Sequence, residues 1–222
     1  MFDPSGVPSS GALPPTADQQ QLLRLNADFL RLAATAARSG TGRATPCLSA
    51  SQNARLAQCS AEGIERMACC SFALFSLSLH RPDLWQRALT RCTVQEDAQH
   101  YGASAASDST EQIRSGFMEC ALFFAWHLAQ QRPRDARFML GMSEDCARVI
   151  ARLELWQCRQ LSQTQVHLLG PRWIQHPYFW NDLLCYGGSG DARHFKLACL
   201  LGSQLMAQDL EPSAILHLSN TE

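Results

Sequence analysis

Apolar residues recur at the spacing of an α-helix along most of this chain, and this pattern constrains the fold more than any other feature. Between Thr16 and about Arg38, the apolar residues that would line one buried face are Leu22, Leu25, Phe29, Leu32 and Ala36. Similar stretches follow, bounded by capping residues, glycines and prolines. No segment alternates apolar and polar residues for long enough to favour a β-sheet. The sequence therefore predicts an all-α protein.

Caps and breakers predict where the other helices begin and end. Ser51 is expected to cap a short helix through about Cys59, and Ser60 a helix through about Leu77. Pro82 stands in the first turn of the next helix. In the second half, helices are expected from Asp108 or Ser109 to before Pro133, from Ser143 to about Arg152, from Leu155 to Val166, from Pro177 to Leu184 and from Asp191 to about Gln208.

Stretches rich in small and polar residues divide the chain into two helical modules. Residues 1–15 are mostly proline, glycine and serine, which predicts a disordered leader. Residues 101–109 have a similar character and predict a linker. The first module is then expected over 16–100 and the second over 110–211, with a tail over 212–222.

The two modules follow the same order of caps, breakers and large apolar residues, about 92 to 95 residues apart. Ser51 corresponds to Ser143, and Trp85 to Trp180. Identity is low, so two unrelated runs of short amphipathic helices are the alternative to duplication. A duplicated module predicts a pseudo-dimer, in which each half covers the apolar face of the other.

Composition narrows the classes of function. The net charge is −1, so any contact with DNA needs a local basic face. The N-terminus does not resemble a secretory signal, and no apolar run approaches the roughly 18 residues of a membrane span. We therefore expect a cytoplasmic protein.

Cysteines and histidines are scattered rather than clustered. Ten cysteines lie mostly among apolar residues without C-x-x-C spacing, so they are expected to be small buried hydrophobes, with a disulfide between protomers as the alternative. The seven histidines form no helical metal pair. The stretch Gly187–Gly190 is expected to link two helices. No pair of titratable residues suggests catalysis, so we expect neither an enzyme nor a cofactor.

Arginines concentrate in the second module, where seven fall within 41 residues. A helix capped by Ser143, a tight link and a helix from Leu155 would form a unit like a helix-turn-helix. The polar residues of this unit that would contact the base edges of DNA are Gln157, Arg159, Gln160 and Gln163. The candidate DNA contacts are Arg137, Arg148, Arg152, Arg159, Gln163 and Gln165.

A solvated arginine face or a protein-binding surface is the alternative for these residues. We expect Arg148 and Arg159 on one exposed face. The large aromatic residues expected to anchor either the core or an interface are Trp156, Trp173, Phe179 and Trp180. Of these, the candidates for a partner interface are Trp156, Trp173 and Trp180.

The stretch from Phe123 to Trp173 resembles FlhD, one subunit of the bacterial flagellar master regulator of transcription. The Leu-Gly turn of that family corresponds to Leu140, Gly141, Met142, Ser143, Glu144, Asp145 and Ala147. Its middle segment corresponds to Ile150, Leu153, Leu155, Gln157 and Leu161, and its last to Leu168, Leu169, Gly170, Pro171, Arg172 and Trp173. The first half carries the same pattern in degraded form, without the Leu-Gly turn.

The resemblance implies a homodimeric module that joins a second subunit, FlhC, binds promoter DNA with it and recruits RNA polymerase. In that complex the zinc belongs to FlhC. A tandem chain would resemble a covalently joined FlhD dimer, either as a monomeric pseudo-dimer or as a homodimer.

Three positions depart from the family pattern. Leu169 stands where FlhD usually has a cysteine, so the inter-subunit disulfide of the family is not expected. Phe138 and Met139 replace a Phe-Arg pair whose arginine is linked with DNA contact, and Arg137 lies one residue away. Gln165 stands where the family often has asparagine.

These features predict a transcriptional regulator or co-regulator, with the first module as structural partner and the second for recognition. Its partners would be an FlhC-like subunit or another protein, and promoter DNA. The alternative is an adaptor or antagonist that binds an FlhC-like partner without contacting DNA.

Overall fold

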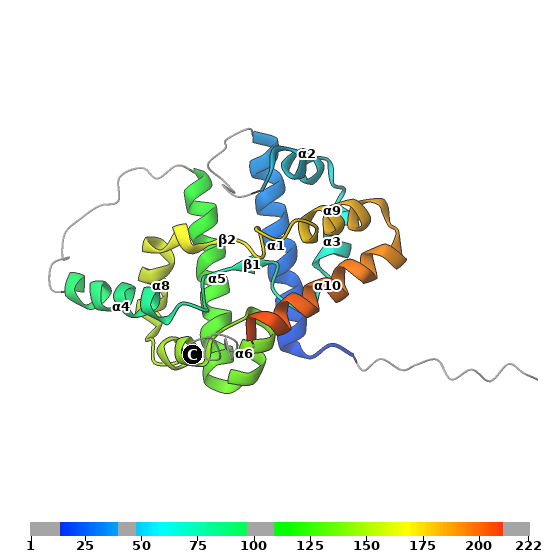
Figure 1. Ribbon diagram of the computed structural model, residues 1–222. Helices are drawn as coiled ribbons and strands as arrows, with labels where there is room; N and C mark the ends of the chain where they lie inside the picture. Colours follow the sequence, from blue (N-terminus) through cyan, green and yellow to red (C-terminus); the bar gives the residue numbers. More distant parts are fainter. Residues whose placement is uncertain (1–13, 40–47, 97–108, 211–222) are drawn as a thin grey trace, which may run out of the picture.

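The computed structural model describes residues 14–39, 48–96 and 109–210, which are almost entirely helical (Figure 1). The first half contains α1 (Ala17–Ser39), α2 (Ala50–Gln58), α3 (Ala61–Ala68), the strand β1 (Phe75–Ser76) and α4 (Pro82–Glu96). The second contains α5 (Ser109–Gln131), α6 (Pro133–Leu140), α7 (Glu144–Ile150), α8 (Leu155–Thr164), the 3-10 turn η1 (Val166–Leu168), the strand β2 (Gly170–Pro171), α9 (Phe179–Ser189) and α10 (Ala192–Leu210). The prediction of an all-α fold is confirmed.

Local capping accounts for several helix starts. Thr16 begins α1 as predicted, because its hydroxyl accepts a hydrogen bond from the backbone N–H of Gln19 at 3.2 Å. Ser143 caps α7 in the same way. The prediction for α2 was wrong by two residues: Ser49 is the cap, and Ser51 lies in the first turn. Ser49 is favoured because Gln52, three residues later, completes a capping box with it.

The third helix is shorter than predicted. It ends at Ala68, and the chain from Cys69 to Leu77 is not helical and is mostly buried. Asn26, fully buried in α1, explains the change: its amide donates to the carbonyl of Phe72 at 2.9 Å and accepts from the N–H of Leu74 at 2.9 Å. These bonds satisfy backbone groups that a helix would otherwise pair internally.

The expected linker over Gly187–Gly190 is mostly helical, and this prediction was wrong. Gly187 continues α9 because it packs against Met67, where an added Cβ would lie 2.2 Å from the side chain. The helix ends only at Gly190, whose φ of +81° suits glycine.

The strands β1 and β2 form an antiparallel pair in the middle of the described structure (Figure 1). Phe75 lies opposite Pro171, and Ser76 opposite Gly170. Each strand has only two residues, which is too short for an alternating pattern to reveal it in the sequence.

The two halves of the chain are interleaved rather than separate. The long helices α1 and α5 lie in contact, α4 packs against α7 and α8, and α9 packs against α2 and α3 (Figure 1). Each half therefore covers helices of the other. Most of the expected leader, the linker up to 108 and the tail lie outside the described residues.

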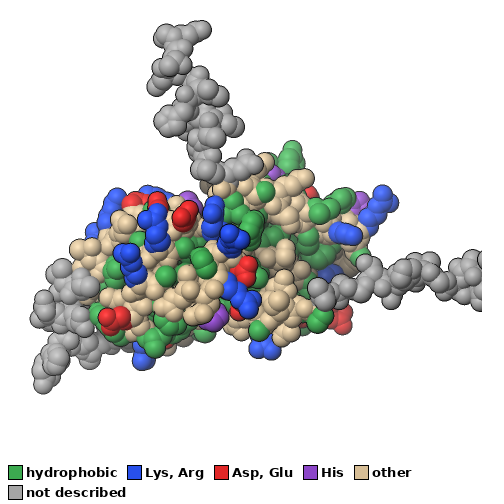
Figure 2. Space-filling view, turned by 90° about the horizontal axis from the view of Figure 1, so that it is seen from below, with side chains coloured by type: hydrophobic (Ala, Val, Ile, Leu, Met, Phe, Trp, Pro, Cys, Tyr) green, Lys and Arg blue, Asp and Glu red, His purple; other side chains and the backbone are tan. Residues whose placement is uncertain are grey.

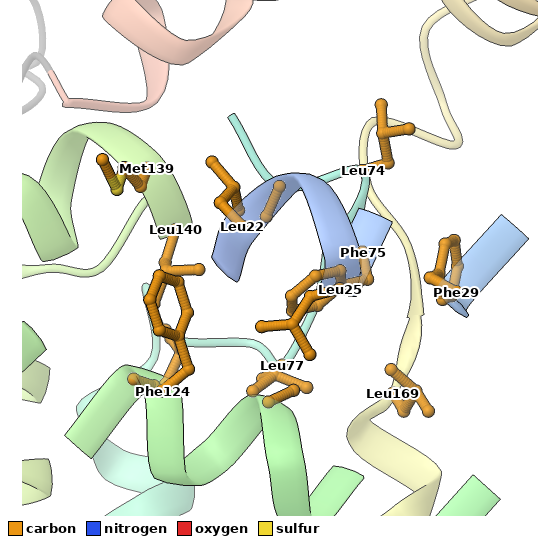
Figure 3. Packing of buried hydrophobic residues seen from close by; sticks show 14 of the residues in the cluster. Leu22, Leu25, Phe29, Leu74, Phe75, Leu77, Phe124, Met139, Leu140 and Leu169 are labelled. Carbon is orange, nitrogen blue, oxygen red and sulfur yellow. The ribbon is translucent and has the colours of Figure 1, made fainter. Parts of the chain in front are cut away.

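One continuous hydrophobic core joins the two halves (Figure 3). Within this core, the rings of Phe29, Phe75 and Phe117 contact one another, with centroids 5.2–5.9 Å apart. Trp85 and Trp180 are both buried, and each indole N–H donates to a backbone carbonyl eight residues earlier. Next to each bond, the chain turns through a residue with positive φ: Ser78 (55°) and Trp173 (50°).

Candidate functional site

The turn between α6 and α7 carries the Leu-Gly pattern and organises the candidate site. Gly141 ends α6 with a φ of +64°, a conformation that favours glycine. Ser143 then caps α7, and its N–H donates to the carbonyl of Leu79 at 3.0 Å. Since Leu79 belongs to the first half, the turn is fixed by both halves of the chain.

Arg172, the residue directly after β2, packs into this turn. An added Cβ on Gly141 would lie 1.7 Å from Nη2 of Arg172, so the turn requires glycine for space as well as for conformation. Arg172 Nη2 donates to the carboxylate of Asp209 at 3.0 Å, and the guanidinium lies 4.5 Å from the ring centroid of Trp173. Burial lowers the pKa of Arg172, and Asp209 opposes that shift.

Arg172 is the last of the seven arginines concentrated in the second module, but it does not belong to an exposed arginine surface. It is only 7 % exposed, and its charge is balanced inside the protein. The sequence could not show this, because Gly141 lies 31 residues before Arg172 and Asp209 lies 37 residues after it.

The other arginines of this region do face solvent. Arg148, Arg152 and Arg159 are exposed, Gln163 is exposed, and Arg137 and Gln165 are half-buried. Arg148 forms an ion pair with Asp145. Within the described ranges, no carboxylate lies at ion-pair distance from Arg152 or Arg159. The exposure expected of Arg148 and Arg159 is observed; that they share one face stays a prediction.

Figure 2 shows the surface seen from below, at the end of the molecule where α6 lies. Lys and Arg side chains are spread over this face, and Asp and Glu side chains lie among them.

Helices α7 and α8 are joined by residues 151–154, and both pack against α5 and α4. Two of the four polar residues on α8 that were expected to contact base edges form hydrogen bonds within the protein instead. Gln157 accepts a hydrogen bond from the N–H of Glu154 at 2.9 Å, which caps α8. Gln160 accepts from the thiol of Cys92 in α4 at 2.9 Å. Arg159 and Gln163 are exposed to solvent.

The three tryptophans expected at a partner interface occupy different environments. Trp180 is 1 % exposed, so of the two roles expected for it, core anchor or interface anchor, the structure shows the core role. Trp173 is half-buried between Phe72 and Phe179 and donates to Asp209 at 2.8 Å. Trp156 is half-buried and donates to Glu154 at 2.6 Å.

Two exposed apolar side chains were not singled out by the sequence. Leu155, the first residue of α8 and the chain neighbour of Trp156, is 58 % exposed, and Phe138, on a different helix, α6, is 64 % exposed. Single exposed apolar residues are common on monomers, but large ones beside a half-buried tryptophan are typical of protein-binding surfaces.

Burial governs the chemistry of several thiols. It raises the pKa of Cys146 to about 12 and that of Cys158 to about 11, so both stay protonated near neutral pH and are poor nucleophiles. In the described part of the chain, no group of three or more His, Cys, Asp or Glu side chains is arranged to hold a metal ion.

No helix of residues 14–39, 48–96 or 109–210 combines the length and apolar character needed to cross a membrane.

Compared with known families, residues 120–218 match the model of the family described as flagellar transcriptional activator (FlhD). The match runs from the middle of α5 through α10 and does not extend into the first half. No curated protein and no solved structure matches the chain.

Proposed function

From the match over residues 120–218, we propose that this chain is a cytoplasmic transcriptional regulator or co-regulator related to FlhD. It acts by binding, not by catalysis, together with an FlhC-like subunit. The observation that carries the proposal is that the matched region contains the Leu-Gly turn at Gly141 and, after it, the exposed Arg152 and Arg159, to which no described carboxylate lies at ion-pair distance.

In this proposal, the first half takes the place that a second FlhD protomer takes in the family dimer. The interleaving supports it, because α4 covers helices of the second half and α9 covers helices of the first. Trp85 and Trp180, which lie about 95 residues apart in the chain, also support it. Both are buried, and the indole N–H of each donates to a backbone carbonyl eight residues earlier. One chain would then be a complete pseudo-dimer.

The DNA-facing surface in this proposal comprises Arg148, Arg152, Arg159 and Gln163. Arginine binds phosphate with two parallel hydrogen bonds, and an exposed glutamine can read a base edge. The ion pair of Arg148 with Asp145 is solvent-exposed, so opening it costs less than about 1 kcal/mol. It therefore does not prevent contact with phosphate.

A second candidate function is an adaptor or antagonist that holds an FlhC-like subunit away from DNA. Two observations favour it. Gln157 and Gln160 are occupied inside the protein, which reduces the groups that could read bases. The exposed Leu155 beside Trp156, and the exposed Phe138, suit a protein partner better than a phosphate backbone.

The test is a titration of the purified chain against a flagellar promoter duplex and a random duplex of equal length. It is run at two salt concentrations, with and without an FlhC-like subunit. The regulator proposal expects promoter-selective, salt-sensitive binding that requires the subunit. Replacing Arg152 or Arg159 by alanine should lower the slope of log K against log salt by about one for each phosphate that the protein no longer neutralises.

Arg55→Ala is the matched control, because Arg55 is an exposed arginine on α2, outside the matched region. It should leave the slope unchanged. Binding to the subunit with no gain on DNA, or with loss of the subunit's own DNA binding, would favour the adaptor. Binding to neither partner would overturn both proposals.

A further inference from the structure

Two cysteines from distant parts of the chain meet where α10 crosses the first half. Cys70 follows the end of α3, and Cys199 lies in the middle of α10. Their sulfur atoms are 3.7 Å apart and share a hydrogen bond. Cys70 is 1 % exposed, whereas Cys199 is half-buried and so reachable from solvent.

Helix α10 is attached along a narrow stripe. Of its 19 residues, only Ala198, Gly202 and Met206 are buried. Gly202 fits under two aromatic rings, since an added Cβ there would lie 2.1 Å from Phe72 and 2.9 Å from Phe179. The last turn is held by Asp209 through Arg172 and Trp173. Cys199 sits in the same stripe, one residue from Ala198, between these attachments.

We propose that Cys70 and Cys199 are a covalent modification site, at which a low-molecular-weight disulfide such as oxidised glutathione converts the two thiols to an internal disulfide. The thiolate of Cys199 attacks one sulfur of the oxidant and releases one thiol. The thiolate of Cys70 then attacks the sulfur of Cys199 in the mixed disulfide and releases the second thiol. Two protein thiols lose two electrons and two protons, and one small disulfide becomes two small thiols.

The environment assigns different roles to the two thiols. The hydrogen bond from Cys70 lowers the pKa of Cys199, which favours the thiolate of the more accessible sulfur. The same hydrogen bond, together with burial, raises the pKa of Cys70, so the buried thiol keeps its proton until the mixed disulfide forms.

Cys69 is the competing thiol, because it is exposed and precedes Cys70 directly. Its S–H donates to the carbonyl of Glu65 at 3.2 Å, in the last turn of α3. Among the described cysteines, Cys70 and Cys199 form the one pair with a sulfur–sulfur contact, so the disulfide should be specific to them.

A disulfide at this point would fasten α10 covalently to the buried segment that leads into β1. Because that segment belongs to the first half and α10 to the matched second half, the bond would fix the position of α10 relative to the whole core. Oxidation would then change how readily α10 detaches, without altering the exposed arginines of α7 and α8.

The test starts from the reduced full chain, which is exposed to oxidised glutathione and then digested without reductant. Peptide mass spectrometry should find a Cys70–Cys199 disulfide ahead of any other modification. Hydrogen exchange of the α10 amides should slow on the order of tenfold or more, because the opened state is constrained. Cys199→Ser should abolish both effects, and Cys69→Ser and Cys120→Ser should leave them intact.

Three results would overturn the proposal. One is a disulfide from Cys199 to Cys69 instead of Cys70. Another is glutathione attached to Cys199 with no internal disulfide, at the same rate as to the exposed Cys120. The last is a Cys70–Cys199 disulfide that leaves exchange in α10 unchanged. The readout on the wild-type chain does not depend on whether the variants fold or whether the chain binds DNA.

Discussion

Trp85 and Trp180 make the same hydrogen bond in the two halves of the chain. The indole N–H of Trp85 donates to the carbonyl of Leu77 at 3.2 Å, and that of Trp180 to the carbonyl of Arg172 at 2.6 Å. Both side chains are buried, at 0 % and 1 % exposure. Both tryptophans therefore belong to one hydrophobic core shared by the two halves, and through this core the halves stabilise each other.

Replacing either tryptophan by alanine should destabilise the whole protein equally. A buried tryptophan truncated to alanine costs about 3–5 kcal/mol, and both variants should lose this amount in a single unfolding transition. Denaturant unfolding monitored by circular dichroism measures it. Trp156→Ala, at a half-buried position, is the control and should lose much less. Two transitions, with each variant lowering only one, would mean that the halves fold independently.

Two glycines should respond to alanine with opposite signs. Gly141→Ala combines a positive φ with an overlap on Arg172, so it should destabilise by about 2 kcal/mol or more. Gly116→Ala lies inside α5 with open space around it, and should stabilise by about 0.5–1 kcal/mol. The free energy of unfolding of both variants checks this. A neutral Gly141→Ala would show that Arg172 is free to move out of the turn.

Asp209 should contribute more to the free energy of unfolding than an ordinary surface carboxylate does. Asp209→Ala leaves the buried guanidinium of Arg172 without its counter-charge, and should destabilise by about 2–3 kcal/mol, since Asp209 itself is 41 % exposed. Adding Arg172→Met removes the stranded charge and should recover part of the loss. If the double variant is less stable by the sum of the two single losses, the pair is not coupled.

Stability should decline at alkaline pH because of two buried thiols. Burial raises the pKa of Cys146 from 9.0 to about 12, and that of Cys158 from 9.0 to about 11. Their contribution is fully present below pH 9.0, and is lost as the pH rises toward these folded-state values, because only the unfolded chain releases the protons. The slope reaches about 1.4 kcal/mol per pH unit for each thiol.

The measurement is the free energy of unfolding as a function of pH from neutral to alkaline. Combining Cys146→Ala with Cys158→Ala should flatten the decline, whereas Cys185→Ala, at an exposed position, should not. An unchanged slope in the double variant would assign the decline to other groups.

Features set by neighbours in the sequence were predictable. The helix starts at Thr16, Ser60 and Ser143 depend on a side chain that bonds a backbone N–H three residues later, and each was read from the sequence. The exposure of Arg148 and Arg159 follows from the same local amphipathic pattern.

Features set by distant residues were not predictable. The early end of α3 depends on Asn26, 46 residues before Phe72. The burial of Arg172 depends on Asp209, 37 residues later. The loss of Gln160 as an expected base contact depends on Cys92, 68 residues earlier. In each case a polar group forms a hydrogen bond with a partner far away in the sequence, and the local sequence pattern does not indicate which residue that partner is.

Binding of an FlhC-like subunit is central to both proposed functions, and calorimetric titration of one protein into the other tests it most directly. We predict saturable binding in the absence of DNA, which both the regulator and the adaptor require. Absence of heat and of any complex at concentrations where both proteins are folded would contradict the claim.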